Sequence, residues 1–105
     1  MLFRSLGFGH YLLGLQMTNA AEWQASAESL DLAIERGLPG VPFVRNAARR
    51  LAIAAYRAGD RVRTQHAIDA LRGPGMTQTD QLLALDWEQR LELDATGRLT
   101  KSLPK

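Results

Sequence analysis

The stretch that decides the fold is LGLQMTNAAEWQASAESLDLA, residues 13–33, together with LAIAAYRAGDRVRTQHAIDAL, residues 51–71. Small and large apolar residues occupy matching positions in the two segments, which lie 38 residues apart. The matched positions are Leu13-Gly14 with Leu51-Ala52, Met17 with Ala55, Ala20 with Ala58, Ser26 with Thr64, Leu30 with Ile68 and Ala33 with Leu71. A fixed period of this length is typical of stacked helical hairpins, in which each hairpin buries its apolar face against the next.

Glycine, proline and capping residues divide the chain into about five predicted helices. Asn19 and Asp60 are predicted to cap two of them, Thr77 or Thr79 a third, and Gly59 is a predicted left-handed helix end. Short connections make neighbouring helices antiparallel. We therefore predict a single all-α domain over residues 1–97 and a tail over 98–105, with hairpins at about 3–36 and 43–72 and an extra helix at about 77–95.

Composition excludes several classes of site. The chain has 105 residues and no cysteine, so it can form no disulfide, zinc–thiolate site or thiol nucleophile, and a cytoplasmic location is expected. No segment has the length and purity of a membrane span, so we expect no membrane partner. The glycines match neither a phosphate loop nor a dinucleotide fingerprint, and the two histidines have no ligand pair at helical spacing. We accordingly predict no cofactor, no metal site and no enzymatic activity.

Charge is distributed unevenly along the chain although the net charge is only +2. The segment 20–35 carries −4, the segment 36–72 carries +6, and the segment 77–96 carries −4. One interpretation is that neighbouring acidic and basic helices compensate one another. The other is that the middle third presents a basic face to an acidic partner, with arginines suited to bidentate contacts with carboxylate or phosphate.

The hairpins resemble the tetratricopeptide repeat. In the first hairpin the resemblance rests on His10, Leu13-Gly14, Met17, Ser26, Leu30, Ala33 and Pro39. In the second it rests on Ala48, Leu51-Ala52, Ala55, Thr64, Ile68 and Leu71, and Ala84, Trp87 and Leu91 continue it into a third first-helix. The period is four residues longer than the usual 34 of that family. The resemblance implies a short right-handed array of antiparallel helix hairpins.

The resemblance also implies a binding groove lined by the first helix of each hairpin. Carried over by position, its residues are Phe8, Tyr11, Leu15 and Asn19 from the first helix, and Asn46, Arg49, Ile53, Tyr56 and Arg57 from the third. Guanidinium groups and an amide beside a tyrosine can hold a peptide carboxylate through charge-assisted hydrogen bonds. The alternative is that these arginines are solvated and pair with acids of the second helix.

The last predicted helix leaves part of its apolar surface without a covering element. Its packing face is predicted to consist of Leu83, Trp87 and Leu91, whereas Leu82, Leu85 and Leu93 lie on other faces. Three explanations remain open for these exposed leucines: self-association as a homodimer, continuation of a longer array, or shielding by residues 98–105.

These patterns predict a non-catalytic protein–protein interaction module. It is expected to bind a peptide or helix of a partner, for which an acidic segment is one candidate, or a copy of itself, through its grooved face. The alternative function is a regulatory or nucleic-acid-binding helical domain that uses the arginine-rich middle segment. Acidic segments on both sides of that arginine-rich region would repel a long polyanion, so nucleic acid is the less favoured partner.

Overall fold

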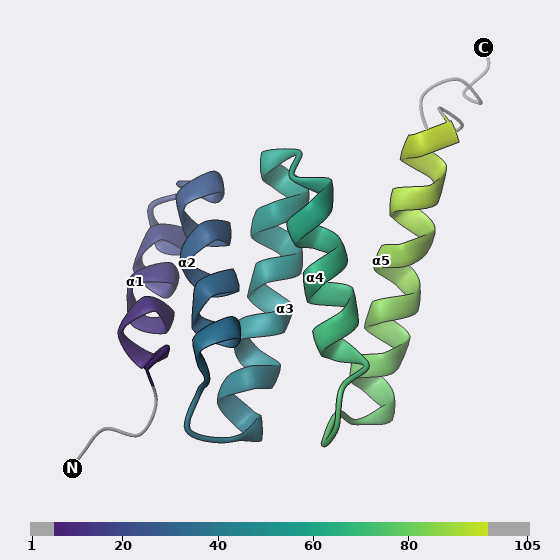
Figure 1. The fold of residues 1–105 in the computed structure, drawn as a ribbon. Helices are drawn as coiled ribbons and strands as arrows, with labels where there is room; N and C mark the ends of the chain where they lie inside the picture. The colour runs from purple at the N-terminus through teal and green to yellow at the C-terminus, as the bar shows by residue number, and fades with distance from the viewer. Residues whose placement is uncertain (1–5, 97–105) are drawn as a thin grey trace.

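The computed structural model describes residues 6–96 and is built from helices alone within that range. Five helices follow one another across the molecule in sequence order (Figure 1). They are α1 (Phe8–Asn19), α2 (Trp23–Arg36), α3 (Val41–Ala58), α4 (Arg61–Leu71) and α5 (Gln78–Thr96). Consecutive helices pack against each other, and α1 also contacts α3 as α2 contacts α4. The predicted all-α helical array is therefore confirmed.

Most of the predicted helix ends are confirmed by local geometry. Gly59 takes the left-handed conformation (φ 76°) after α3, and the Asp60 carboxylate accepts a hydrogen bond from the Arg63 backbone N–H at 3.0 Å. Thr77 caps α5, since its hydroxyl oxygen accepts from the Asp80 N–H at 3.1 Å. α3 starts at Val41, two residues earlier than expected, because Pro42 needs no N–H partner in the first turn of a helix.

The boundary between α1 and α2 differs from the prediction. Asn19 ends α1 instead of capping α2, which begins only at Trp23. The Ala20 N–H donates to the Gln16 and Met17 carbonyls, and Ala21 then reverses the chain with a positive φ of 59°. These bonds satisfy the last carbonyls of α1, so the helix continues to Asn19 before it turns. The predicted start of the first helix at residue 3 lies outside the described residues.

Four of the matched pairs are buried in both hairpins, whereas Met17 is only half-buried and Ala20 is exposed. Gly14 and Ala52 are buried, as are Ser26 with Thr64, Leu30 with Ile68, and Ala33 with Leu71. Leu13, in contrast, is 42% exposed, whereas Leu51 is completely buried. The difference arises because α2 precedes α3 and covers Leu51, while no described helix precedes α1.

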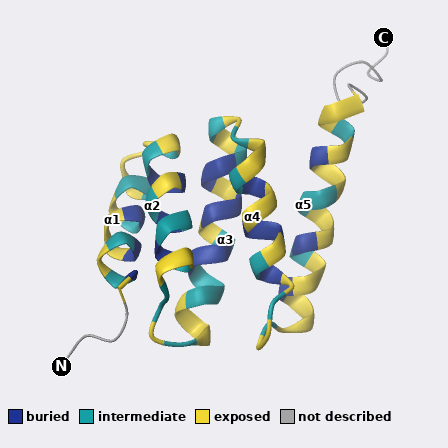
Figure 2. Cartoon of the chain, in the orientation of Figure 1, coloured by how far each residue is buried: buried dark blue, intermediate teal, exposed yellow. Residues whose placement is uncertain are grey.

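Small residues let the central helices approach closely. α3 is covered on two sides, and most of its buried residues are alanines (Figure 2). The buried residues of α3 are Ala47, Ala48, Leu51, Ala52, Ala54 and Ala55. In the first hairpin Gly14 has the same role, since a Cβ atom there would lie 2.7 Å from the Leu30 side chain. More residues are buried in α3 than in α5, where only Asp80, Ala84 and Leu91 are buried.

None of the helices between residues 6 and 96 is long and apolar enough to cross a membrane.

The close approach at Gly14 predicts that the effect of Gly14→Ala on the free energy of unfolding changes sign when Leu30 is shortened. Gly14→Ala adds about 1 kcal/mol of helix propensity, but it forces the new methyl group into Leu30, and overpacking costs about 1–3 kcal/mol. We expect Gly14→Ala to destabilise the wild-type chain and to stabilise a Leu30→Ala background, as measured by urea unfolding. Equal effects in the two backgrounds would contradict the contact.

Candidate functional site

The structure places part of the predicted groove in the core. Tyr11 is only 7% exposed, and its hydroxyl oxygen accepts a hydrogen bond from the Asn46 side-chain amide at 2.7 Å. The rings of Phe8 and Phe43 pack against Tyr11 at 5.8 and 5.7 Å between centroids. The interaction thus ties α1 to α3. Tyr11 therefore lies beneath the surface and does not line an open groove, a correction to its expected position.

Of two other predicted groove residues, Asn19 lies elsewhere, and the guanidinium group of Arg49 is bound by a carboxylate. Asn19 is exposed at the end of α1. It is not among the described residues that line the two hollows between α3 and α5. Arg49 turns toward the start of α5, where its Nε and a terminal guanidinium nitrogen donate to Asp80 Oδ1 at 2.9 and 2.7 Å. Arg49 does pair with a carboxylate, but that carboxylate belongs to α5 and not to the second helix.

Asp80 is the buried centre of this ion-pair cluster. Its side chain is completely buried, and Oδ2 accepts hydrogen bonds from Arg45 Nε at 2.9 Å and from the Thr77 N–H at 3.0 Å. Burial alone raises the pKa of the Asp80 carboxyl, but the hydrogen bonds from Thr77, Arg49 and Arg45 outweigh burial and hold that pKa well below its ordinary value. One carboxylate thus joins α3 to α5, and the two arginines leave the cluster with a net positive charge.

A groove runs between α3 and α5, and four of the predicted residues line it. A hollow of about 400 Å³ is lined by Ile53, Tyr56 and Arg57 from α3 and by Trp87 and Arg90 from α5. A second hollow of about 230 Å³ shares Ile53, Trp87 and Arg90 with the first. Because they share these residues, we treat the two hollows as one α3–α5 groove. Its second part is also lined by Arg49, Leu71, Leu83 and Asp86.

The guanidinium groups at this groove are poorly neutralised. Arg57 lies over the ring of Trp23 at 5.0 Å, and no carboxylate of the described residues is within ion-pair distance of it. Arg90 lies over Trp87 at 5.3 Å and has only a 3.7 Å ion pair with exposed Asp86. Such an exposed pair contributes little. Both charges are therefore available to an anionic group.

Ile53 supplies an apolar surface between these charges. It is 42% exposed, although isoleucine is among the residues most often buried in proteins. Arg50 is exposed on the same side of α3 by helical spacing, three residues before Ile53 and seven before Arg57. The arrangement can hold an apolar side chain and a neighbouring carboxylate at the same time.

Tyr56 separates the groove from a larger cavity. Its ring packs against Trp87 at 5.1 Å between centroids, and its hydroxyl donates a hydrogen bond to Asp94 at 2.8 Å. That hydrogen bond, together with partial burial, raises the pKa of the Tyr56 phenol above its ordinary value. Beyond the ring lies a cavity of about 510 Å³, lined by Tyr56, Gly59, Asp60, Arg61, Thr64, Leu91, Asp94 and Ala95.

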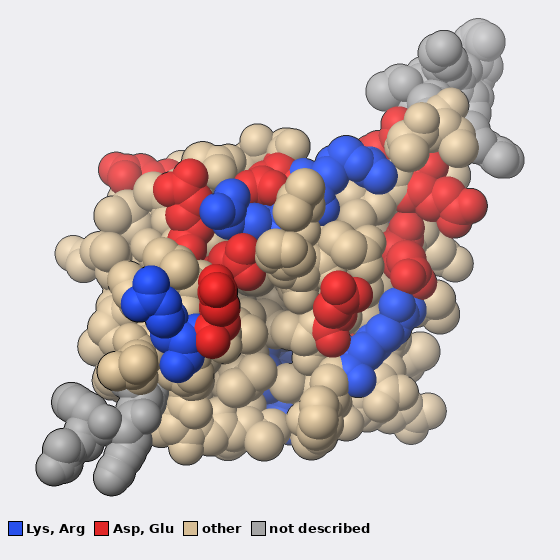
Figure 3. All heavy atoms as spheres, in the orientation of Figure 1, with Lys and Arg blue, Asp and Glu red and all other residues tan. Residues whose placement is uncertain are grey.

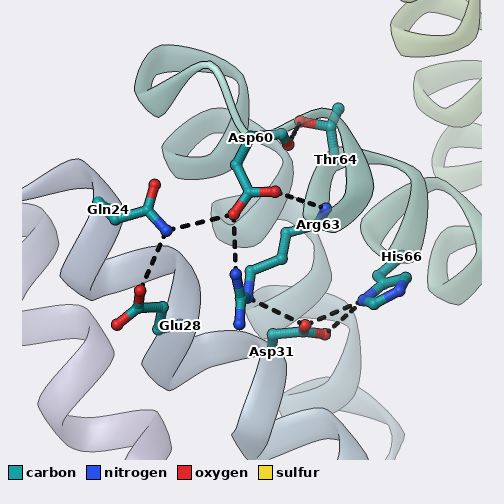
Figure 4. A network of polar contacts seen from close by, with 7 residues as sticks. All are labelled: Gln24, Glu28, Asp31, Asp60, Arg63, Thr64 and His66. Carbon is teal, nitrogen blue, oxygen red and sulfur yellow. Dashed lines mark hydrogen bonds and ion pairs between the residues drawn. The ribbon is translucent and has the colours of Figure 1, made fainter.

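The face formed by α2 and α4 carries charges that compensate one another. Figure 3 shows acidic and basic side chains intermixed over this face. Arg63 contacts both Asp31, at 3.2 Å, and Asp60, at 2.9 Å, and Asp31 also contacts His66 Nδ1 at 2.9 Å (Figure 4). The network links α2 to α4. Compensation between neighbouring helices, one of the two interpretations of the charge pattern, is therefore confirmed for these pairs.

Among residues 6–96, no group of three or more His, Asp or Glu side chains is placed to hold a metal ion. No family model matches this chain, and searches of curated proteins and of solved structures give no match either.

Three residues of the site were missing from the sequence prediction: Trp23, Trp87 and Arg90 as neighbours of Arg57. Trp87 was assigned to a repeat position, and Arg90 follows it by three residues, which places both on one side of α5. The closeness of that side to α3 depends on Asp80, whose pairing with arginines 31 and 35 residues earlier has no local signal.

Removal of the Asp80 charge is predicted to destabilise the fold in a pH-dependent manner. Asp80→Asn leaves two arginines without their carboxylate and should cost about 3 kcal/mol at neutral pH. Since the pKa of Asp80 is lower in the folded state, its contribution is present above the unfolded pKa of about 4 and is lost as pH falls below that value. Urea unfolding at several pH values should show the difference between wild type and Asp80→Asn shrinking in acid.

The control for this experiment is Asp86→Asn, because Asp86 is 59% exposed and makes only a long ion pair. Its cost should stay within about 0.5 kcal/mol at every pH. A comparable loss in both variants would show that the Asp80 cluster does not hold α5.

Proposed function

We propose that this protein is a non-catalytic protein-interaction module whose α3–α5 groove binds an acidic segment of a partner protein. The observation that carries the proposal is the exposed Ile53, which lies in the groove beside the guanidinium groups of Arg57 and Arg90. An exposed apolar side chain beside weakly neutralised cations is suited to a peptide that carries a hydrophobic residue next to Asp or Glu.

The fold supports the same conclusion by analogy. Stacked antiparallel hairpins resemble the tetratricopeptide repeat, whose first helices line a peptide-binding groove. The first helices of this array are α1, α3 and α5, and the groove lies between the last two of them. This part of the reasoning rests on architecture alone and identifies no partner. The absence of cysteine from the whole sequence supports a reducing compartment such as the cytoplasm.

The alternative, nucleic-acid binding by the arginine-rich middle segment, has less support. Half of the eight arginines between residues 36 and 72 contact a carboxylate: Arg45, Arg49, Arg63 and Arg72. Binding to a nucleic acid needs arginines that are free to neutralise its phosphates and thereby release the counterions condensed on it. A strong salt dependence of binding to random duplex DNA would favour this alternative over the peptide.

The groove can be tested with peptides selected from a displayed random library. Because the chain has only two tryptophans, one lining the groove and one beneath Arg57, binding can be followed by intrinsic fluorescence. Selected peptides should carry Asp or Glu beside an apolar residue. Arg57→Glu should weaken binding about tenfold, which corresponds to about 1.4 kcal/mol. Higher salt should weaken it as well.

The matched control is Arg36→Glu, which makes the same charge change at an exposed position at the end of α2. Ile53→Asp provides a second groove variant that does not disturb the stacking on Trp23. If Arg57→Glu and Arg36→Glu weaken binding equally, the affinity reflects overall charge and the groove is not the site. Selected peptides without acidic residues would also contradict the proposal.

A further inference from the structure

The two hollows of the α3–α5 groove differ in the residues that line them. The hollow of about 400 Å³ alone has Tyr56 and Arg57 among its described lining residues, and we call it the arginine hollow. The hollow of about 230 Å³ alone has Leu71 and Leu83, and we call it the leucine hollow. The residues that line both are Ile53, Trp87 and Arg90.

The charged groups at the leucine hollow have partners within the chain. Arg49 donates from Nε and a terminal nitrogen to Asp80 Oδ1 at 2.9 and 2.7 Å. Asp86 and Arg90 carry opposite charges and form the 3.7 Å pair. At the arginine hollow, by contrast, Arg57 has no carboxylate of the described residues within ion-pair distance. The leucine hollow therefore presents less free charge to a ligand than the arginine hollow.

Aliphatic and aromatic side chains form the rest of the leucine hollow. Leu71 is completely buried, and the half-buried Leu83 and Trp87 pack against the same core. An apolar side chain that enters this hollow removes apolar surface of both molecules from water, which favours binding. A water molecule takes about 30 Å³ of the liquid. The hollow of about 230 Å³ thus has room for one large side chain, such as Leu, Met or Phe.

The two hollows follow one another along the groove. On α3, Arg49 lines the leucine hollow, Arg57 lines the arginine hollow, and Ile53 lines both. α5 runs in the same direction as α3 (Figure 1) and has the same order, since Leu83 lines only the leucine hollow whereas Arg90 lines both. The midpoint between Arg49 and Ile53 lies four residues before the midpoint between Ile53 and Arg57, which is about 6 Å along a helix axis.

This separation matches the repeat of an extended peptide. Such a chain advances about 3.3 Å per residue, and its alternate side chains point to the same side. Residues two positions apart therefore lie about 7 Å from each other and can enter the two hollows together. An extended chain is also narrower than a helix, about 5 Å against about 10 Å across, so it fits between α3 and α5 without displacing either helix.

We propose that the leucine hollow takes a large apolar side chain of an extended peptide, two residues away from the acidic residue that Arg57 and Arg90 bind. The inference rests on the proposed function of the α3–α5 groove, and it adds the size and the spacing of a second contact. Leu83 is the specificity-determining residue, because it lines the leucine hollow and not the arginine hollow. The size of its side chain sets the size of the apolar residue that the hollow accepts.

The test changes the size of Leu83 in the full chain and determines which apolar residue the peptide needs. Displayed random peptides selected on wild type should have Leu, Met or Phe two residues from Asp or Glu. Leu83→Ala enlarges the hollow, so selection on this variant should favour Trp at the same position. In fluorescence anisotropy, a labelled peptide with Leu there should bind wild type about tenfold more tightly than its Trp counterpart, and Leu83→Ala should reverse this order.

The matched control is Leu82→Ala, which makes the same change one residue earlier. Leu82 is 59% exposed and is not among the described residues that line either hollow, so its replacement should leave the preference unchanged. Leu83→Phe is a second variant, which keeps an apolar side chain in place and narrows the hollow. It should favour Val or Ala in the peptide, and it decides the matter if circular dichroism shows that Leu83→Ala loses the helices.

The outcomes separate this inference from the proposed function. If Arg57→Glu weakens binding but neither Leu83 variant changes the preferred apolar residue, the groove binds acidic peptides and this inference is wrong. If the Leu83 variants change that preference while Arg57→Glu has no effect, the leucine hollow takes a side chain but the acidic contact of the proposed function is wrong.

The spacing in the selected peptides is a further readout. A spacing of four residues would identify a helical peptide as the occupant, and the absence of any fixed spacing would show that the two hollows do not act together. Either result would overturn the inference. A library without any binder would contradict both the proposed function and this inference.

Discussion

A single buried carboxylate positions the last helix, and the α3–α5 groove depends on that position. Asp80 has no exposed surface, caps the start of α5 together with Thr77, and accepts hydrogen bonds from Arg45 and Arg49 of α3. A buried charge without partners is costly, so the contact is specific in its geometry. Near the other end of α5, the Tyr56–Asp94 hydrogen bond repeats the link to α3.

The groove forms because different sides of α3 carry side chains of different size. Alanines occupy the two sides of this helix that α2 and α4 cover, and they allow close packing. Its long side chains are thereby confined to the remaining side, where Arg50, Ile53 and Arg57 follow each other at helical spacing. Since α5 is held against the same side, Trp87 and Arg90 complete a hollow that α3 alone does not form.

The candidate site could be predicted only in part. Ile53, Tyr56 and Arg57 were expected from the family resemblance, and they do line one hollow. Tyr11 was expected beside them, but it is buried against Asn46. Arg49 was expected to be available, but it bonds to Asp80, because an arginine side chain reaches several directions from one backbone position and the nearest buried carboxylate decides among them.

The order of residues was sufficient to predict the helices and the repeated pattern of their packing faces. Spacing of small and large apolar residues defines the packing faces, and Gly59 and Asp60 act through the backbone next to them, so both effects can be read locally. The exposure of Leu13 against the burial of Leu51, the pairing of each arginine and the shape of the groove required the folded chain. They depend on which helix lies beside which, and contacts between residues 30 or more positions apart carry no local pattern in the sequence.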